Sequence, residues 1–339
     1  MPTFMPIMSV SETDGQVQSD TLLPTPSGIR SAAQQLQAYG CETPLTKSSV
    51  LAKDLNAHVW IKNETVSPIR CFKHRGALTH LLRVGDHTRA ATVVTSSTGN
   101  HGLGVAYAAK QLGSLAHIFL PRDASSVKRS AIEQLGATIH HFGKDIDEAK
   151  GEARMFAAEQ GYGFVDDGES LDVIEGAGTA GLEIVRLLKN IDFVFVPMGS
   201  GSLVSGCACA VKSTSPNTKV IAVQSSGSRA MAESFRQRRT VSLSISTVAD
   251  GLVCREPADL ALRSLLAFVD DVEIVEDAQI LSSVCDLAVN CGLLVEPSGA
   301  AALAGARNRR AEIADRRVVI MATGANISRE TLELLGLSA

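Results

Sequence analysis

Short apolar runs alternate along this chain with longer segments in which apolar residues recur every three or four positions. The short runs predict strands at 91–96, 116–121, 137–142, 192–197, 219–224 and 317–323. The longer segments predict helices at 104–113, 125–136 and 203–213. The predicted strands are apolar on both faces and are separated by helix-length connections. The pattern therefore predicts an α/β fold with two open, mainly parallel sheets flanked by helices.

The alternation also suggests how the chain is divided. One compact α/β unit, residues 89–169, is embedded in a larger one built from both flanks, residues 21–88 and 170–339. Residues 1–20 have no such pattern, and we expect a flexible lead-in there. They also lack a basic segment followed by an apolar one, so we expect no secretory signal.

Composition narrows the class of protein. Of the 339 residues 45% are hydrophobic and 20% are charged, and the formal net charge is −4. Acidic and basic residues are mixed throughout, which argues against a nucleic-acid binder or a membrane-surface protein. No apolar run approaches the roughly 20 residues that span a bilayer. Seven cysteines form no CxxC pair, so we expect a reduced, cytoplasmic protein.

Two loops follow predicted strands and have unusual compositions. In parallel sheets the ligand crevice lies beyond the carboxyl ends of the strands, where both loops would fall. The loop at 198–206, MGSGSLVSG, suits a phosphate, but it matches neither a P-loop nor a dinucleotide fingerprint. Taken alone, such a glycine-rich turn is more often merely structural. The loop at 96–102, SSTGNHG, suits a carboxylate, or it is an ordinary helix-capping turn.

Three further segments carry candidate chemistry. CFKHRGA at 71–77 places Lys73 between an aromatic ring and two basic side chains. VEPSGAAALAG at 295–305 contains Glu296, either a site group or a common helix-start acid. IMATGANIS at 320–328 ends a strand with the hydroxyl of Thr323.

Together, in their order along the chain, the five segments resemble the fold-type II pyridoxal-phosphate enzymes, in particular the serine/threonine dehydratase and serine racemase group. The resemblance implies a tryptophan synthase β-like fold and pyridoxal 5'-phosphate as cofactor. It implies that Lys73 holds the cofactor as a Schiff base and moves the substrate's Cα proton, with Phe72 packed beside it. A lysine in that role needs burial or nearby positive charge to lower its pKa.

The same resemblance implies roles for the loops. The expected phosphate-binding residues are Gly199, Ser200, Gly201, Ser202 and Leu203. The expected carboxylate-binding residues are Ser97, Thr98, Asn100 and His101. It places Asn100 and Glu296 among the cofactor-binding groups and Thr323 at the pyridine nitrogen, where a neutral hydroxyl suits rapid elimination over a long-lived carbanion.

Five positions depart from the family pattern. Cys71 replaces the usual serine, and Arg70 before it is either a surface charge or a contact to a distal substrate group. Thr98 stands where the racemase has a second acid/base serine, so we expect elimination ahead of racemisation. Gln224 and Ala230 replace carboxylates of the metal-binding members, so we expect no divalent metal there.

The resemblance thus implies an ammonia-lyase that converts a β-hydroxy amino acid to a 2-oxo acid and ammonia. Serine, threonine, hydroxyaspartate and β-aryl serines all remain open as substrates. A racemase or a β-replacement synthase is the alternative within the same chemistry, and a catalytically silent relative is the alternative outside it. Family precedent implies a homodimer. The chain ends shortly after the last motif, so we expect no C-terminal regulatory domain.

Overall fold

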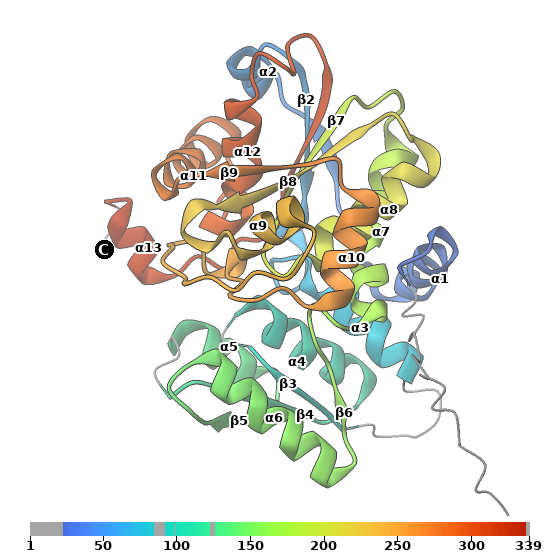
Figure 1. Ribbon diagram of the computed structural model, residues 1–339, viewed down its shortest axis with the longest axis vertical. Helices are drawn as coiled ribbons and strands as arrows, with labels where there is room; N and C mark the ends of the chain where they lie inside the picture. The colour runs from blue at the N-terminus through green and yellow to red at the C-terminus, as the bar shows by residue number, and fades with distance from the viewer. Residues whose placement is uncertain (1–22, 85–91, 98, 123–125, 337–339) are drawn as a thin grey trace, which may run out of the picture.

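The larger of two sheets has six strands and lies in the upper half of Figure 1. The computed structural model describes residues 23–84, 92–97, 99–122 and 126–336. In spatial order the strands are β1 (Leu45–Lys47), β2 (His58–Asn63), β10 (Arg317–Ala322), β7 (Phe193–Pro197), β8 (Lys219–Ser225) and β9 (Asp271–Val275). β1 pairs antiparallel with β2, and the remaining neighbours are parallel.

Helices cover both faces of this sheet. One face packs on α2 (Ser49–Leu55), α11 (Asp277–Cys291) and α12 (Pro297–Asn308); the other packs on α7 (Leu171–Leu187), α8 (Ser202–Thr214), α9 (Ala230–Gln237) and α10 (Asp259–Phe268). Phe193 and Phe195 of β7 belong to the first core, whereas Val194 and Val196 belong to the second. Because successive side chains point to opposite faces, this strand is apolar at every position.

The smaller sheet lies in the lower half of Figure 1 and is parallel throughout. Its order is β5 (Thr138–His141), β4 (Ala116–Leu120), β3 (Val93–Ser96) and β6 (Gly163–Phe164). Its helices are α4 (Asn100–Leu112), α5 (Ser126–Gln134) and α6 (Ile146–Gln160). Ile118 and Leu120 share a core with α4 and α5, and Phe119 shares one with α6.

Three more helices complete the described chain: α1 (Pro26–Leu36), α3 (Lys73–Val84) and α13 (Arg329–Leu334). Helix ends follow local signals. Thr25 caps α1 by accepting from Gly28 N, with proline at the first helical position. Ser170 caps α7 in the same way, and α4 ends at Gly113, which is left-handed.

The predicted fold class is confirmed. Each strand and helix predicted from the sequence is present, with ends shifted by a few residues. The α/β arrangement with two sheets is as expected, and the antiparallel edge strand β1 makes the larger sheet mixed. Among the described residues no helix is long and apolar enough to cross a membrane.

Candidate active site

A cavity of about 340 Å³ lies at the carboxyl ends of β3, β6, β7 and β10, where the loops after these strands converge. Every predicted site residue within the described chain lines it: Phe72, Lys73, Ser97, Asn100, His101, Gly199, Ser200, Gly201, Ser202, Leu203, Glu296 and Thr323. Thr98 lies outside the described residues. Segments separated by more than 200 positions in the sequence therefore meet in one cavity.

Lys73 is the first residue of α3, and the segment before it is tied to the end of β10. The backbone N–H of Phe72 donates to Thr323 O at 3.1 Å, and Cys71 forms a bridge with Gly324. The Lys73 Nζ lies 4.9 Å from the centre of the Phe72 ring and 2.5 Å from Asp167 Oδ2. Its side chain is 12% exposed, so the amine is available to a ligand only from the cavity.

A buried charge network anchors the first turn of α3. Arg75, two residues after Lys73, bonds Glu64 and Glu183. Lys62 contacts Glu183 and Thr43. Burial alone would raise the pKa of Glu64, but Arg75 and Lys62 lower it to about 2. Two cations and two carboxylates thus neutralise one another beneath the lysine.

The glycine-rich loop after β7 leads directly into α8. Gly201, the residue before the helix, has a φ of 92°, a left-handed conformation that favours glycine. A Cβ on Gly199 would lie 2.6 Å from Gly251 O, so that position also needs glycine. The N-terminal N–H groups of a helix favour an anion. Here the helix start has no side-chain cap.

Asn100 and Glu296 interact on the opposite side of the cavity. Asn100 Nδ2 donates to Glu296 Oε1 at 2.5 Å, and Asn326 Nδ2 donates to Asn100 Oδ1 at 2.8 Å. Glu296 is 2% exposed and does not cap α12 through its side chain. Glu296 is therefore not an ordinary helix-start acid, because its carboxylate accepts a hydrogen bond from the amide of Asn100.

Ser97 and His101 flank the start of α4. Ser97 Oγ accepts from Gly99 N at 3.2 Å, which shapes the turn into the helix. His101 Nε2 lies 3.3 Å from Val165 O, and since a carbonyl only accepts, this nitrogen carries the proton. Burial lowers the pKa of His101; Asp167 opposes this effect and Lys73 adds to it. The net effect favours the neutral imidazole.

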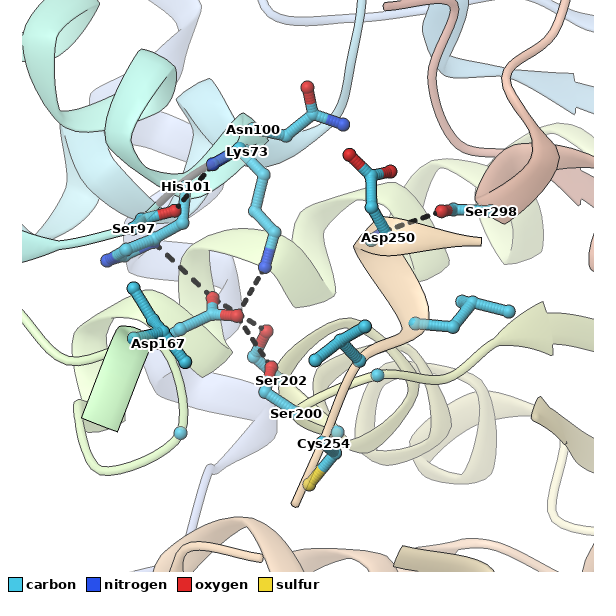
Figure 2. A pocket seen from close by; sticks show the side chains of 18 of the residues that line it. Lys73, Ser97, Asn100, His101, Asp167, Ser200, Ser202, Asp250, Cys254 and Ser298 are labelled. Atoms are coloured by element: carbon cyan, nitrogen blue, oxygen red, sulfur yellow. Dashed lines mark hydrogen bonds and ion pairs between the residues drawn. The ribbon is translucent and has the colours of Figure 1, made fainter. Parts of the chain in front are cut away.

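Sequence reasoning missed Asp167, the carboxylate beside Lys73 (Figure 2). It follows β6, which has only two residues and gives no strand pattern. Burial would raise its pKa, but Lys73 and His101 hold it well below its usual range. A pair of acids, Asp166 and Asp167, at the end of a parallel strand is the signal that could have indicated this position.

A family model described as pyridoxal-phosphate dependent enzyme matches residues 36–324. This chain belongs to that family. It is 35% identical over 298 residues to the chloroplastic biosynthetic threonine dehydratase of Arabidopsis thaliana, covering 87% of this chain and 50% of the relative. It is 30% identical over 307 residues to the L-threo-3-hydroxyaspartate ammonia-lyase of Saccharomyces cerevisiae, covering 90% and 94%.

The fold is also similar to that of solved structures. The structure of maize serine racemase superposes with a TM-score of 0.86 at 29% identity, covering 92% of this chain and 97% of that one. The chain spans about half the length of the biosynthetic threonine dehydratases that it matches, 49% to 57%. The fold-type II assignment predicted from the motifs is confirmed.

The cavity of this family member fits its pyridoxal-phosphate cofactor. It offers a lysine amine, a glycine loop at a helix N-terminus and two loop hydroxyls, Ser200 and Ser202. A Cβ on Gly199 would lie against Gly251 O and one on Gly201 against Met231 Cε, so the loop backbone is closely packed where it lines the cavity. These groups would hold an aldehyde that also carries a phosphate.

The departures from the family pattern have distinct environments. Cys71 is fully buried, and its backbone N–H and carbonyl both bond Ser67 Oγ. Arg70 is exposed, has a φ of 55° and does not line the cavity. Gln224 Oε1 accepts from Ala232 N, so the amide ties β8 to α9. In the described parts of the chain, no group of three or more His, Cys, Asp or Glu residues could hold a metal ion.

Proposed function

We propose that this protein is a pyridoxal-phosphate-dependent ammonia-lyase that converts a β-hydroxy amino acid to a 2-oxo acid and ammonia by α,β-elimination. The observation that carries the proposal is the convergence of Lys73, the glycine loop and the Asn100–Glu296 pair on one cavity. Threonine dehydratase and hydroxyaspartate ammonia-lyase relatives support the reaction type.

Each group then has a role that its environment suits. Lys73 would bind the cofactor aldehyde, and Gly199 through Leu203 would bind its phosphate. Asn100, held by Glu296, would orient the ring, and Thr323 would face the pyridine nitrogen. Ser97, Thr98 and the N-terminal turn of α4 would bind the substrate carboxylate. His101 would position that turn instead of binding substrate, because its Nε2 already bonds Val165 O.

The cofactor, when bound, supplies an electron sink for the charge that develops at Cα. Lys73 Nζ removes the Cα proton, and the Cβ–O bond breaks as the hydroxyl leaves with a proton as water. The resulting enamine product tautomerises to an imine, which water hydrolyses to the 2-oxo acid and ammonia. Lys73, 12% exposed beside the Phe72 ring, is shielded from bulk water for this proton transfer.

A spectroscopic and a kinetic measurement test the proposal. Purified protein with added pyridoxal phosphate should show a visible absorbance band that Lys73→Ala abolishes. Lys150→Ala is the matched control, since Lys150 lines the same cavity but pairs with Asp166, and it should keep the band. A band that persists unchanged in Lys73→Ala would refute the assignment.

A panel of β-hydroxy amino acids, scored for 2-oxo acid and for enantiomer exchange, separates the lyase from a racemase. Exchange without 2-oxo acid would establish the racemase alternative instead.

We also propose that residues 21–88 and 170–339 form the cofactor-binding domain and 89–169 the small domain. A homodimer in the cytoplasm completes the proposal. No disulfide joins the cysteines of the described residues, which supports a reducing compartment. Sedimentation analysis tests the dimer.

A further inference from the structure

The carboxylate of Asp167 contacts both the proposed cofactor lysine and the proposed phosphate loop. Its Oδ2 accepts from Lys73 Nζ at 2.5 Å and from Ser200 Oγ at 2.6 Å. Its Oδ1 lies 3.2 Å from Ser202 Oγ and 3.5 Å from His101 Nδ1. Figure 2 shows Asp167 between Lys73 and the two serines. Any ligand that binds beside Lys73 is therefore close to this charge.

Acidic groups outnumber basic ones around the cavity. Six carboxylates line it: Asp147, Asp166, Asp167, Asp250, Glu256 and Glu296. The lining lysines and arginines within the described chain are Lys73, Lys150 and Arg255. Each of these three cations is already in an ion pair, with Asp167, Asp166 and Asp147 respectively. The described lining thus holds six carboxylates and three cations, and each of the cations is already paired with a carboxylate.

A cofactor phosphate on the glycine loop would add more negative charge to the same lining. A substrate with a second carboxylate would then lie near like charges, and it could gain a cation only by breaking one of these ion pairs. Like-charge contacts of this kind disfavour one partner over another.

We propose that Asp167 is the residue that selects substrate charge, favouring β-hydroxy amino acids with uncharged side chains over those with a second carboxylate. The inference rests on the proposed function and narrows its substrate class. The yeast relative is named for hydroxyaspartate, which carries that second carboxylate. This chain should act instead on a serine-, threonine- or β-aryl-serine-type substrate.

The test measures binding to the holoenzyme without turnover. L-Alanine and L-aspartate differ by one carboxylate, and neither has a β-hydroxyl to expel, so perturbation of the visible band gives their dissociation constants. The wild type should bind aspartate about tenfold or more weakly than alanine, and Asp167→Asn should reduce that ratio about tenfold. Asp167→Ala is titrated in parallel in case the amide disturbs the cofactor.

Glu256→Gln is the matched control. It removes one negative charge from the same lining, but Glu256 bonds Ser242 rather than Lys73, so the ratio should stay within about twofold because the charge is more remote and exposed. Equal affinity of the wild type for alanine and aspartate would overturn the proposal. An unchanged ratio in both Asp167 variants would overturn the assignment to Asp167.

Turnover separates this inference from the function on which it rests. The values of kcat/KM for threonine and threo-3-hydroxyaspartate should rank as the binding ratio does, with the gap narrowed in Asp167→Asn. If no β-hydroxy amino acid yields a 2-oxo acid, the proposed lyase function is refuted, and the alanine-to-aspartate ratio still decides whether Asp167 selects charge. A wild type that prefers hydroxyaspartate would overturn the inference alone.

Discussion

Lys62→Met should destabilise the protein strongly, although it removes no group from the active site. The Lys62 side chain is fully buried and contacts Glu183 and the backbone and hydroxyl of Thr43. With Lys62 gone, Glu64 and Glu183 face Arg75 alone, and the buried network has a net negative charge. Removing one partner of a buried ion pair costs about 3–5 kcal/mol. At about 2 °C per kcal/mol for a chain of this size, Tm should fall by about 6–10 °C.

The network also makes stability depend on pH. The pKa of Glu64 is lowered from its usual 4.5 to about 2. Its contribution is therefore fully present above about pH 4.5 and is lost as the pH falls toward 2. A shift of this size amounts to about 3 kcal/mol. Lys62→Met removes one of the two cations that lower this pKa, so acid unfolding should begin at a higher pH.

Thermal and urea unfolding, with far-UV circular dichroism as the signal, provide the measurement. Lys219→Met is the control, because Lys219 also belongs to a strand of the larger sheet and pairs with a glutamate, but on the surface; it should cost less than about 1 kcal/mol. The double variant Lys62→Met/Glu183→Gln restores neutrality and should cost about 1–3 kcal/mol less than the sum of its single variants. A Lys62→Met loss no larger than that of Lys219→Met, or strict additivity in the double variant, would refute the reasoning.

Two further predictions concern packing and thiols. Gly206→Ala should lower the free energy of unfolding by about 1–3 kcal/mol, since its Cβ would lie 2.1 Å from Ile174 O between α7 and α8. Gly151→Ala, in open space on α6, should raise the free energy of unfolding by about 0.5–1 kcal/mol. A Gly206→Ala variant that is more stable than Gly151→Ala would contradict the close contact between α7 and α8. Of the seven cysteines, exposed Cys285 alone should react quickly with a thiol reagent at pH 8, since burial raises the pKa of Cys207 and Cys254 to about 12. Rapid reaction of most thiols in the native protein would show that the core is not closed.

The sequence predicted those site residues that lie in short motifs at strand ends. Asn100, Gly199 and Thr323 each lie at or just after the end of a predicted strand and at or beside a glycine, so their place at the carboxyl edge of a sheet follows from chain geometry. Lys73 and Glu296 were identified from the family resemblance instead. What the pattern could not give was which edges face one another. That Asn100 bonds Glu296, across 196 positions of sequence, depends on packing between the two sheets.

The residues that were missed lie where the local pattern is weak. β2 carries Lys62 among apolar residues, and its charge argues against a buried strand until Glu64, Arg75 and Glu183 are seen to neutralise it. β6 has two residues, too few to show alternation, so Asp167 had no strand to follow. In both cases the side chain is charged and its ion-pair partner is distant in the sequence, so the local pattern could not predict its position.

The pairing of β2 with β10 has a consequence for synthesis. Val59 lies opposite Val318 in the larger sheet. During synthesis β2, which is made early, therefore cannot pair with β10 until almost the whole chain has been made. The smaller sheet uses only residues 93–164 and can close while the rest of the chain is still on the ribosome. During that interval β2 can pair with β1 on one edge, but its other edge is unpaired, and the future cofactor lysine has no finished cavity around it. We therefore expect the nascent chain to depend on chaperones until its final strand emerges.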